Sequence, residues 1–167
     1  MSETTETAKR VDGRLRGWMW EHGPMLVRWS LAIVFVWFGV LKLFDLSPAN
    51  DIVKRTIYWF DPDVFLPILG VWEVVIGLLL LWQPLVRWGI LLMFLQMPGT
   101  FLPLVLLPEV CFIRFPFVLT MEGQYIVKNI VLIAAAILVG SRLKPLGSDP
   151  SRPRPGSSGE KRRIIVS

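Results

Sequence analysis

The stretch Gly70-Val71-Trp72-Glu73-Val74-Val75-Ile76-Gly77 lies inside an apolar run of 19 residues, from Val64 to Trp82. At about 1.5 Å per residue, a helix of this length crosses the hydrocarbon core of a bilayer. Glu73 lies near its middle, where an ionised carboxylate costs roughly 2.5 kcal/mol or more unless a partner or a proton neutralises it. The run therefore predicts a membrane span, and the other polar residues near it are candidates for that partner.

The rest of the chain has the composition of a membrane protein. Of its 167 residues, 53% are hydrophobic, and the mean hydropathy is +0.54. None of its four apolar runs shows the polar stripe at helical spacing that a helix in a soluble bundle would need. We therefore predict an all-α membrane protein with a four-helix transmembrane bundle. The expected boundaries are a cytoplasmic N-terminal segment at 1–24, a transmembrane domain at 25–143 with spans at about 25–44, 64–82, 85–107 and 125–141, and a disordered basic cytoplasmic tail at 144–167.

The basic residues predict the orientation of this bundle. Four spans place both chain ends on one side, and that side carries 13 of the 18 Lys and Arg residues: Lys9, Arg10, Arg14, Arg16, Arg28, Arg87, Arg142, Lys144, Arg152, Arg154, Lys161, Arg162 and Arg163. The opposite side is richer in acidic residues. By the positive-inside rule, we expect both termini in the cytoplasm and the protein in the cell (inner) membrane.

The connecting segments carry local signals of their own. The segment Ser47–Asp51 is typical of a helix start and predicts a short amphipathic helix on the outer surface. Residues 96–100 contain Pro98, which removes a backbone hydrogen bond and predicts a kink or an unwound section in the third span. Residues 1–13 are polar and are expected to be disordered. The apolar loop 108–123 is expected to dip into the outer leaflet.

The sequence also limits the chemistry that the chain performs alone. Its single cysteine, Cys111, excludes an internal disulfide and a thiol pair, and its single histidine, His22, excludes haem bound by two histidines. Neither count supports a metal site. The net charge of +5 follows from the membrane orientation, so we expect contact with the lipid bilayer and not with nucleic acid.

Two lysines are the expected partners of Glu73. Lys42 and Lys128 enter the outer half of the first and fourth spans, and either would approach the carboxylate if their helices are neighbours. Two amines beside one carboxylate would favour an acidic or anionic group that enters from the outer leaflet. We expect Glu73 to be the catalytic residue, with hydrogen bonds to the ligand from Gln96, Asn129 and Trp72.

Two simpler interpretations remain open. A salt bridge to Glu73 would hold the helices in register without any ligand. Lys42 lies near the outer end of its span, so its side chain would also reach the headgroups without any function.

Three short motifs resemble the DoxX-like family of small membrane proteins. They are Gly39-Val40-Leu41-Lys42 in the first span, the Gly70–Gly77 stretch with Glu73 in the second, and Gly123–Asn129 at the start of the fourth. Residues 97–100, Met-Pro-Gly-Thr, are similar to the YkgB-like branch and the reactive-chlorine-resistance membrane proteins. The resemblance covers about residues 25–143. It implies a four-helix membrane bundle in which Lys42, Glu73 and Lys128 match the intramembrane polar positions.

The resemblance also suggests a function. Relatives include the quinone-reducing membrane subunit of thiosulfate:quinone oxidoreductase and proteins of oxidative-stress defence. The first hypothesis is therefore a redox-associated membrane subunit that binds quinone, receives electrons from a soluble or membrane partner subunit, and has Glu73 as its proton donor or acceptor. A homo-oligomer is a further expected partner state. A small proton-coupled permease or exporter, and a non-catalytic scaffold or assembly factor, are the alternatives.

Overall fold

The computed structural model describes the backbone of residues 3–144 and the side chains of residues 6–144. Four helical segments in this part are long and apolar enough to cross a membrane: Glu6–Leu43, Pro62–Leu81, Gln83–Leu106 and Met121–Ser141. The four-helix membrane fold predicted from the sequence is therefore confirmed. The expected disordered tail falls at residues 144–167, of which all but Lys144 lie outside the described residues.

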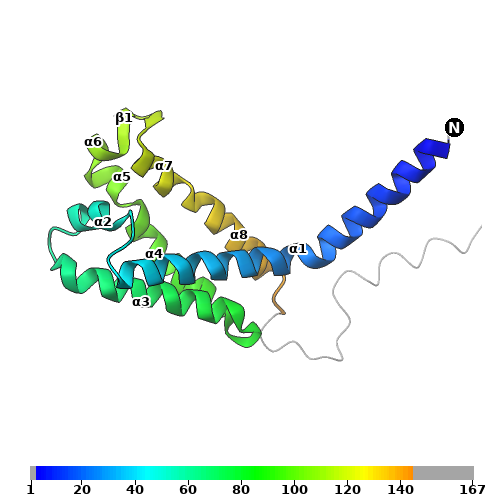
Figure 1. Ribbon diagram of the computed structural model, residues 1–167, viewed down its shortest axis with the longest axis horizontal. Helices are drawn as coiled ribbons and strands as arrows, with labels where there is room; N and C mark the ends of the chain where they lie inside the picture. The colour runs from blue at the N-terminus through cyan, green and yellow to red at the C-terminus, as the bar shows by residue number, and fades with distance from the viewer. Residues whose placement is uncertain (1–2, 145–167) are drawn as a thin grey trace, which may run out of the picture.

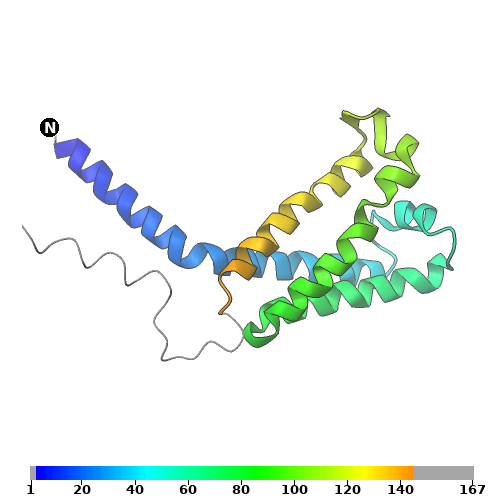
Figure 2. The same ribbon diagram turned by 180° about the vertical axis from the view of Figure 1, so that it is seen from behind.

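The spans form a ring of neighbouring helices. Helix α1 (Glu3–Leu43) packs against α3 (Pro62–Leu81) and α8 (Asn129–Ser141), and α4 (Val86–Phe101) packs against the same two helices. Toward one end of the molecule, α7 (Met121–Val127) and the adjoining part of α8 diverge from α1 and α3 (Figures 1 and 2). The main core lies between the four helices and consists of Leu31, Ala32, Phe35, Ile76, Leu80, Val86, Met93, Met97, Ala136 and Val139.

The connecting elements gather at the end where α7 diverges, which we call the hairpin end (Figure 1). They are α2 (Asn50–Thr56), α5 (Pro103–Leu106), α6 (Pro108–Cys111) and an antiparallel pair of strands, β1 (Phe112–Arg114) and β2 (Val118–Leu119). A second, smaller core ties them together through Ile52, Cys111 and Ile126. At the opposite end, the short 3-10 helix η1 (Gln83–Leu85) turns the chain from α3 into α4.

The expected short helix after the first span forms, but it begins later than the Ser47–Asp51 signal suggests. Its first helical residue is Asn50. The Ser47 hydroxyl instead accepts a hydrogen bond from the backbone N–H of Ala49, at 3.3 Å, inside the preceding turn. Ile52 is buried against the small core, whereas Tyr58 and Trp59, which follow the helix, are exposed.

The expectation of disorder at residues 1–13 is wrong for the part that the structure describes. Helix α1 starts at Glu3 and continues without interruption into the first span (Figure 1). Residues such as Glu, Ala, Lys and Arg are good helix formers, and Arg16 lies 4.0 Å from Asp12 one turn earlier. Pro24 is tolerated because the carbonyl that it leaves unpaired belongs to Trp20, in the exposed part of the helix.

Residues 96–100 form no unwound section, which was one of the two outcomes predicted there. Helix α4 continues through Pro98 to Phe101, and the regular pattern breaks only at Leu102. Pro103 has no N–H to donate to the carbonyl of Gly99, so the N–H of Leu102 bonds that carbonyl in a tighter turn, at 3.3 Å. The break therefore belongs to the second proline of this span.

Candidate functional site

Glu73 is buried in α3 and both of its carboxylate oxygens are hydrogen-bonded. Lys42 Nζ, from α1, donates to Oε2 at 2.6 Å, and Gln96 Nε2, from α4, donates to Oε1 at 2.8 Å. Lys42 and Glu73 are each 7% exposed, and Gln96 is half-buried. We call these three residues the Glu73 triad. The triad therefore joins three helices, α1, α3 and α4, through polar side chains.

Glycines bring the two charges together. Gly39 and Gly70 each precede a charged residue of the triad by three positions, so each shares a helix face with its charge. A Cβ added to Gly39 would lie 2.7 Å from the carbonyl oxygen of Gly70, closer than real Cβ atoms approach. Gly77 meets α1 in the same way, where an added Cβ would lie 2.7 Å from the carbonyl oxygen of Ala32. The glycines therefore let α1 and α3 pack closely enough for a short ion pair.

The end of α1 fixes the backbone from which Lys42 extends. The N–H of Leu46 bonds the carbonyl of Leu41 at 2.8 Å, and the N–H of Asp45 bonds that of Lys42 at 3.2 Å. These two bonds form a Schellman motif, whose left-handed residue is Asp45 at φ 54°. The side chain of Asp45 accepts a hydrogen bond from Asn50 Nδ2 at 2.6 Å. Lys42 thus projects from a helix end that is held to α2.

The triad carries no net formal charge when Lys42 and Glu73 are both ionised. A paired carboxylate is far less costly inside a membrane than an isolated one, so the pair explains how Glu73 is tolerated. The short bond joins an ammonium donor to a carboxylate acceptor. The Gln96 amide keeps Glu73 oriented through its second oxygen.

Two buried polar atoms, one within the triad and one on the residue before Glu73, have no hydrogen-bond partner among the described residues. One is Gln96 Oε1, the amide oxygen that Glu73 does not use, and the other is Trp72 Nε1. Trp72 directly precedes Glu73 and packs against the main core. Buried polar groups in proteins are nearly always paired with protein, water or ligand atoms. One acceptor in the triad and one donor on the adjoining residue therefore lack partners among the described residues.

A family model supplies the comparison with known proteins. The DoxX model matches residues 23–106, which is half of the chain and includes the whole Glu73 triad. The chain belongs to the DoxX family. No curated protein and no solved structure matches it. The membership confirms the resemblance seen in the Gly39–Lys42 and Gly70–Gly77 motifs, and the structure gives their spacing a physical meaning in this DoxX-family chain.

Lys128 and Asn129 are not brought to Glu73. Lys128 is exposed, and its Nζ lies 4.0 Å from the centre of the Tyr125 ring, with no acidic partner among the described residues. Asn129 donates through Nδ2 to the carbonyls of Tyr125 and Ile126, at 3.3 and 2.9 Å. The expectation that both lysines approach the carboxylate therefore holds for Lys42 alone, because α7 diverges from α1 and α3 (Figure 2).

Cys111 lies at the hairpin end of this DoxX-family chain, outside the triad. It is fully buried, and its thiol donates to the carbonyl of Pro103 at 3.5 Å. Burial raises the pKa of the Cys111 thiol, and the carboxylates of Glu122 and Glu109 raise it further. The protonated thiol is a weak nucleophile, so this cysteine has a packing role. Within residues 3–144, no cluster of His, Cys, Asp and Glu could hold a metal ion.

Sequence reasoning missed side-chain contacts that tie α1 and the turn after it to neighbouring elements. The Asp45–Asn50 hydrogen bond and the contact of Arg28 Nη1 with Gln83 Oε1, at 2.6 Å, are examples. The second bond ties α1 to the turn between α3 and α4. Neither pair is marked by spacing or composition.

Proposed function

We propose that this DoxX-family protein is the membrane subunit of a redox system and binds a quinone, or a similar lipophilic ligand with an acidic head, beside the Glu73 triad. The observation that carries this proposal is the combination of a buried, hydrogen-bonded Lys42–Glu73 pair with two buried polar atoms that lack partners, on Gln96 and Trp72. A lipophilic ligand reaches such a group through the bilayer without crossing water.

The two free atoms fit the two oxidation states of a quinone head. Trp72 Nε1 is a donor and suits a carbonyl oxygen, whereas Gln96 Oε1 is an acceptor and suits a hydroxyl. A bound quinone would take up electrons and protons together when it is reduced. In this proposal the Lys42–Glu73 pair holds a proton at the carboxylate or the ammonium and releases it to the ligand oxygen.

Electrons would come from a partner subunit. The sequence contains one cysteine and one histidine, which give neither a thiol pair nor two histidine ligands for a haem. A soluble or membrane-bound redox partner would therefore pass electrons to the ligand, and this chain would supply the binding site and the proton. Lys128 and Asn129 are not needed for that role.

The protein would lie in the cell membrane with both termini in the cytoplasm. The end of the bundle opposite the hairpin carries the Lys- and Arg-rich parts of the chain, such as Arg28, Arg87 and Arg142. The positive-inside rule favours the cytoplasm for that end. The hairpin end, with α2 and the two strands, would then face away from the cytoplasm.

A structural role is the second candidate, and the geometry gives it direct support. The Lys42–Glu73 bond joins α1 to α3, and the Gln96–Glu73 bond joins α4 to the same carboxylate. A purely structural role would require these two bonds and no ligand. The two candidates differ in what Glu73→Gln does, because glutamine keeps the shape of the side chain but loses the charge and the transferable proton.

The test uses the purified full chain in mild detergent with decylubiquinone as the probe. We expect native mass spectrometry to show retention of the quinone by the wild type and a loss of about tenfold or more in Glu73→Gln, which corresponds to about 1.4 kcal/mol. Glu122→Gln, an exposed carboxylate at the hairpin end, is the matched control and should retain quinone normally. Equal retention in wild type and Glu73→Gln, with intact folding, would overturn the proposal.

A further inference from the structure

Lys128 is a charged side chain in a membrane-spanning segment and has no acidic partner among the described residues. It lies in the span Met121–Ser141, seven residues after its start, and is exposed. No acidic side chain pairs with it in residues 6–144, and its described contact is with the ring of Tyr125 at 4.0 Å. An ammonium group in this setting needs a counter-charge, because unpaired charges inside a bilayer are costly.

Its depth limits where that counter-charge lies. Seven residues of helix correspond to about 10 Å along the axis. A lysine side chain extends roughly 6 Å toward the interface, which brings its ammonium to the level of the lipid phosphates if the span starts near the surface. The counter-charge is therefore at headgroup depth on the hairpin side of the membrane.

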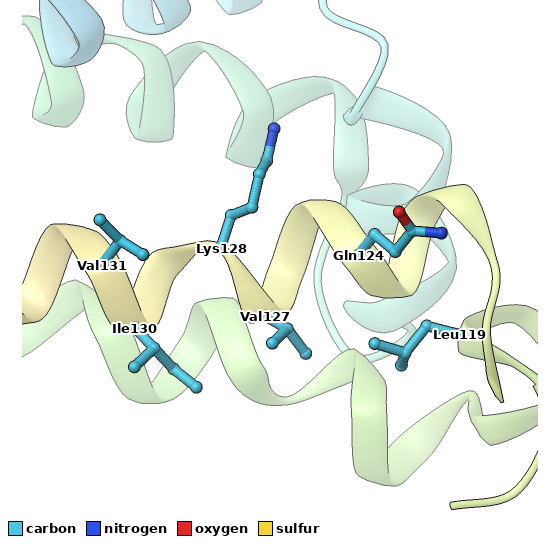
Figure 3. A pocket seen from close by; sticks show the side chains of 6 residues that line it. All are labelled: Leu119, Gln124, Val127, Lys128, Ile130 and Val131. Carbon is cyan, nitrogen blue, oxygen red and sulfur yellow. The ribbon is translucent and has the colours of Figure 1, made fainter. Parts of the chain in front are cut away.

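Lys128 is one of six residues that line a shallow depression of about 450 Å³. Lys128, Gln124 and Val131 stand along one edge of the helix, and Val127 and Ile130 stand along the other (Figure 3). Leu119, from β2, closes the end nearest the strands. One cation and one amide thus lie beside four aliphatic side chains. This is the chemistry of an amphiphile with an anionic head and an apolar chain.

The backbone around Lys128 is held in place. The residue is the junction between α7 and α8, and Asn129 Nδ2 bonds the carbonyls of Tyr125 and Ile126. At the start of the same span, a Cβ on Gly123 would collide with the carbonyl oxygen of Cys111, so this helix packs closely on α6. The lysine therefore projects from a fixed position into the depression.

We infer that Lys128 and this depression bind the phosphate of an anionic membrane lipid, with an acyl chain against Val127, Ile130 and Leu119. The aliphatic lining favours a lipid over free phosphate, since an inorganic anion would leave those side chains without a role. The site is separate from the Glu73 triad, and its existence does not depend on quinone binding.

Lipid titration of the detergent-purified full chain tests this inference. Native mass spectrometry would compare phosphatidylglycerol with phosphatidylcholine of the same acyl chains. We expect the wild type to prefer phosphatidylglycerol, Lys128→Gln to lose about five- to tenfold in phosphatidylglycerol affinity, and Lys128→Arg to keep it. Lys144→Gln, an exposed lysine outside the depression, is the control and should behave as the wild type.

Two further arms separate the outcomes. Val131→Trp keeps the charge of Lys128 but fills the depression, so we expect it to weaken the binding of both lipids. It tests the site independently if Lys128→Gln does not fold. Millimolar inorganic phosphate should leave phosphatidylglycerol bound. The inference is overturned if Lys128→Gln, folded, binds phosphatidylglycerol as Lys144→Gln does. Complete displacement of the lipid by inorganic phosphate would overturn the assignment to a lipid.

Discussion

Lys42 and Glu73 form a 2.6 Å ion pair one helical turn from the point where Gly39 and Gly70 bring α1 and α3 together. The close approach of the backbones and the short charged contact are therefore parts of one arrangement. If either glycine carried a side chain, the helices would separate and the lysine would have to span a wider gap. The predictions below test the parts of this arrangement separately.

Gly39→Ala should destabilise the protein by about 1–3 kcal/mol, because its new Cβ would overlap the backbone of α3. The matched control is Gly99→Ala, in α4, where no atom lies within 4 Å of the added Cβ. That substitution should be neutral or stabilising by up to about 1 kcal/mol, since alanine favours helices. Thermal unfolding followed by circular dichroism in detergent measures both. A Gly39→Ala protein as stable as Gly99→Ala would contradict the packing argument.

The Lys42–Glu73 pair should show strong coupling in a double-mutant cycle. Lys42→Met leaves a buried carboxylate without its cation, which costs about 3–5 kcal/mol when a buried pair is broken. Adding Glu73→Gln removes that uncompensated charge, so the double variant should recover much of the lost stability. Unfolding temperatures of the wild type, both single variants and the double variant give the coupling energy. Additive effects of the two substitutions would show that the residues act independently.

Two small substitutions at Asp45, the left-handed residue that follows α1, should differ in their effect on stability. Asp45→Gly should remain close to the wild type, because glycine adopts φ 54° without cost and offsets the lost bond from Asn50. Asp45→Ala should lose about 1 kcal/mol or more, since alanine is disfavoured in this conformation. Their melting temperatures, measured side by side, check the order. If alanine proves as stable as glycine here, the Schellman motif does not determine this helix end.

Cys111 should react slowly with alkylating reagents near neutral pH. Burial and the two nearby carboxylates raise its pKa above the ordinary value, so its thiolate forms only at higher pH than in a free cysteine. For the same reason stability should fall as pH rises past the ordinary thiol pKa, where the unfolded chain loses this proton and the folded chain keeps it. Iodoacetamide rates between pH 7 and 10 measure the first effect. Glu122→Gln should shift the rate profile toward lower pH, and an unshifted profile would exclude Glu122 as a cause.

Much of the fold could be predicted from the sequence, because each span is a mostly apolar run near the length of a bilayer crossing. The Glu73 pairing was also partly predictable. A carboxylate in mid-span requires a partner, and Lys42 and Gln96 lie at compatible depths in other spans. Their glycine neighbours then determine which two helices approach.

Other features depend on information that spacing does not contain. Lys128 enters the same half of the bundle as Lys42, but α7 diverges from α1 and α3 (Figure 2), and Lys128 is exposed over the Tyr125 ring. The third span has two prolines, Pro98 and Pro103, and spacing does not tell which of them breaks the helix. The break lies where a tighter turn satisfies the carbonyl that Pro103 leaves unpaired. The polar residues at the start of α1 are helical because they extend the helix that the apolar span forms. Their polar composition alone predicts disorder.

The most direct test of the central claim uses the Lys42→Met, Glu73→Gln double variant, in which both charges are absent and the cost of an unpaired carboxylate is removed. If the triad is a ligand site, this variant should fold and yet lose decylubiquinone retention by about tenfold or more, as Glu73→Gln does. If the folded double variant retains quinone as well as the wild type, the pair is a structural link between α1 and α3 and the proposed function is wrong.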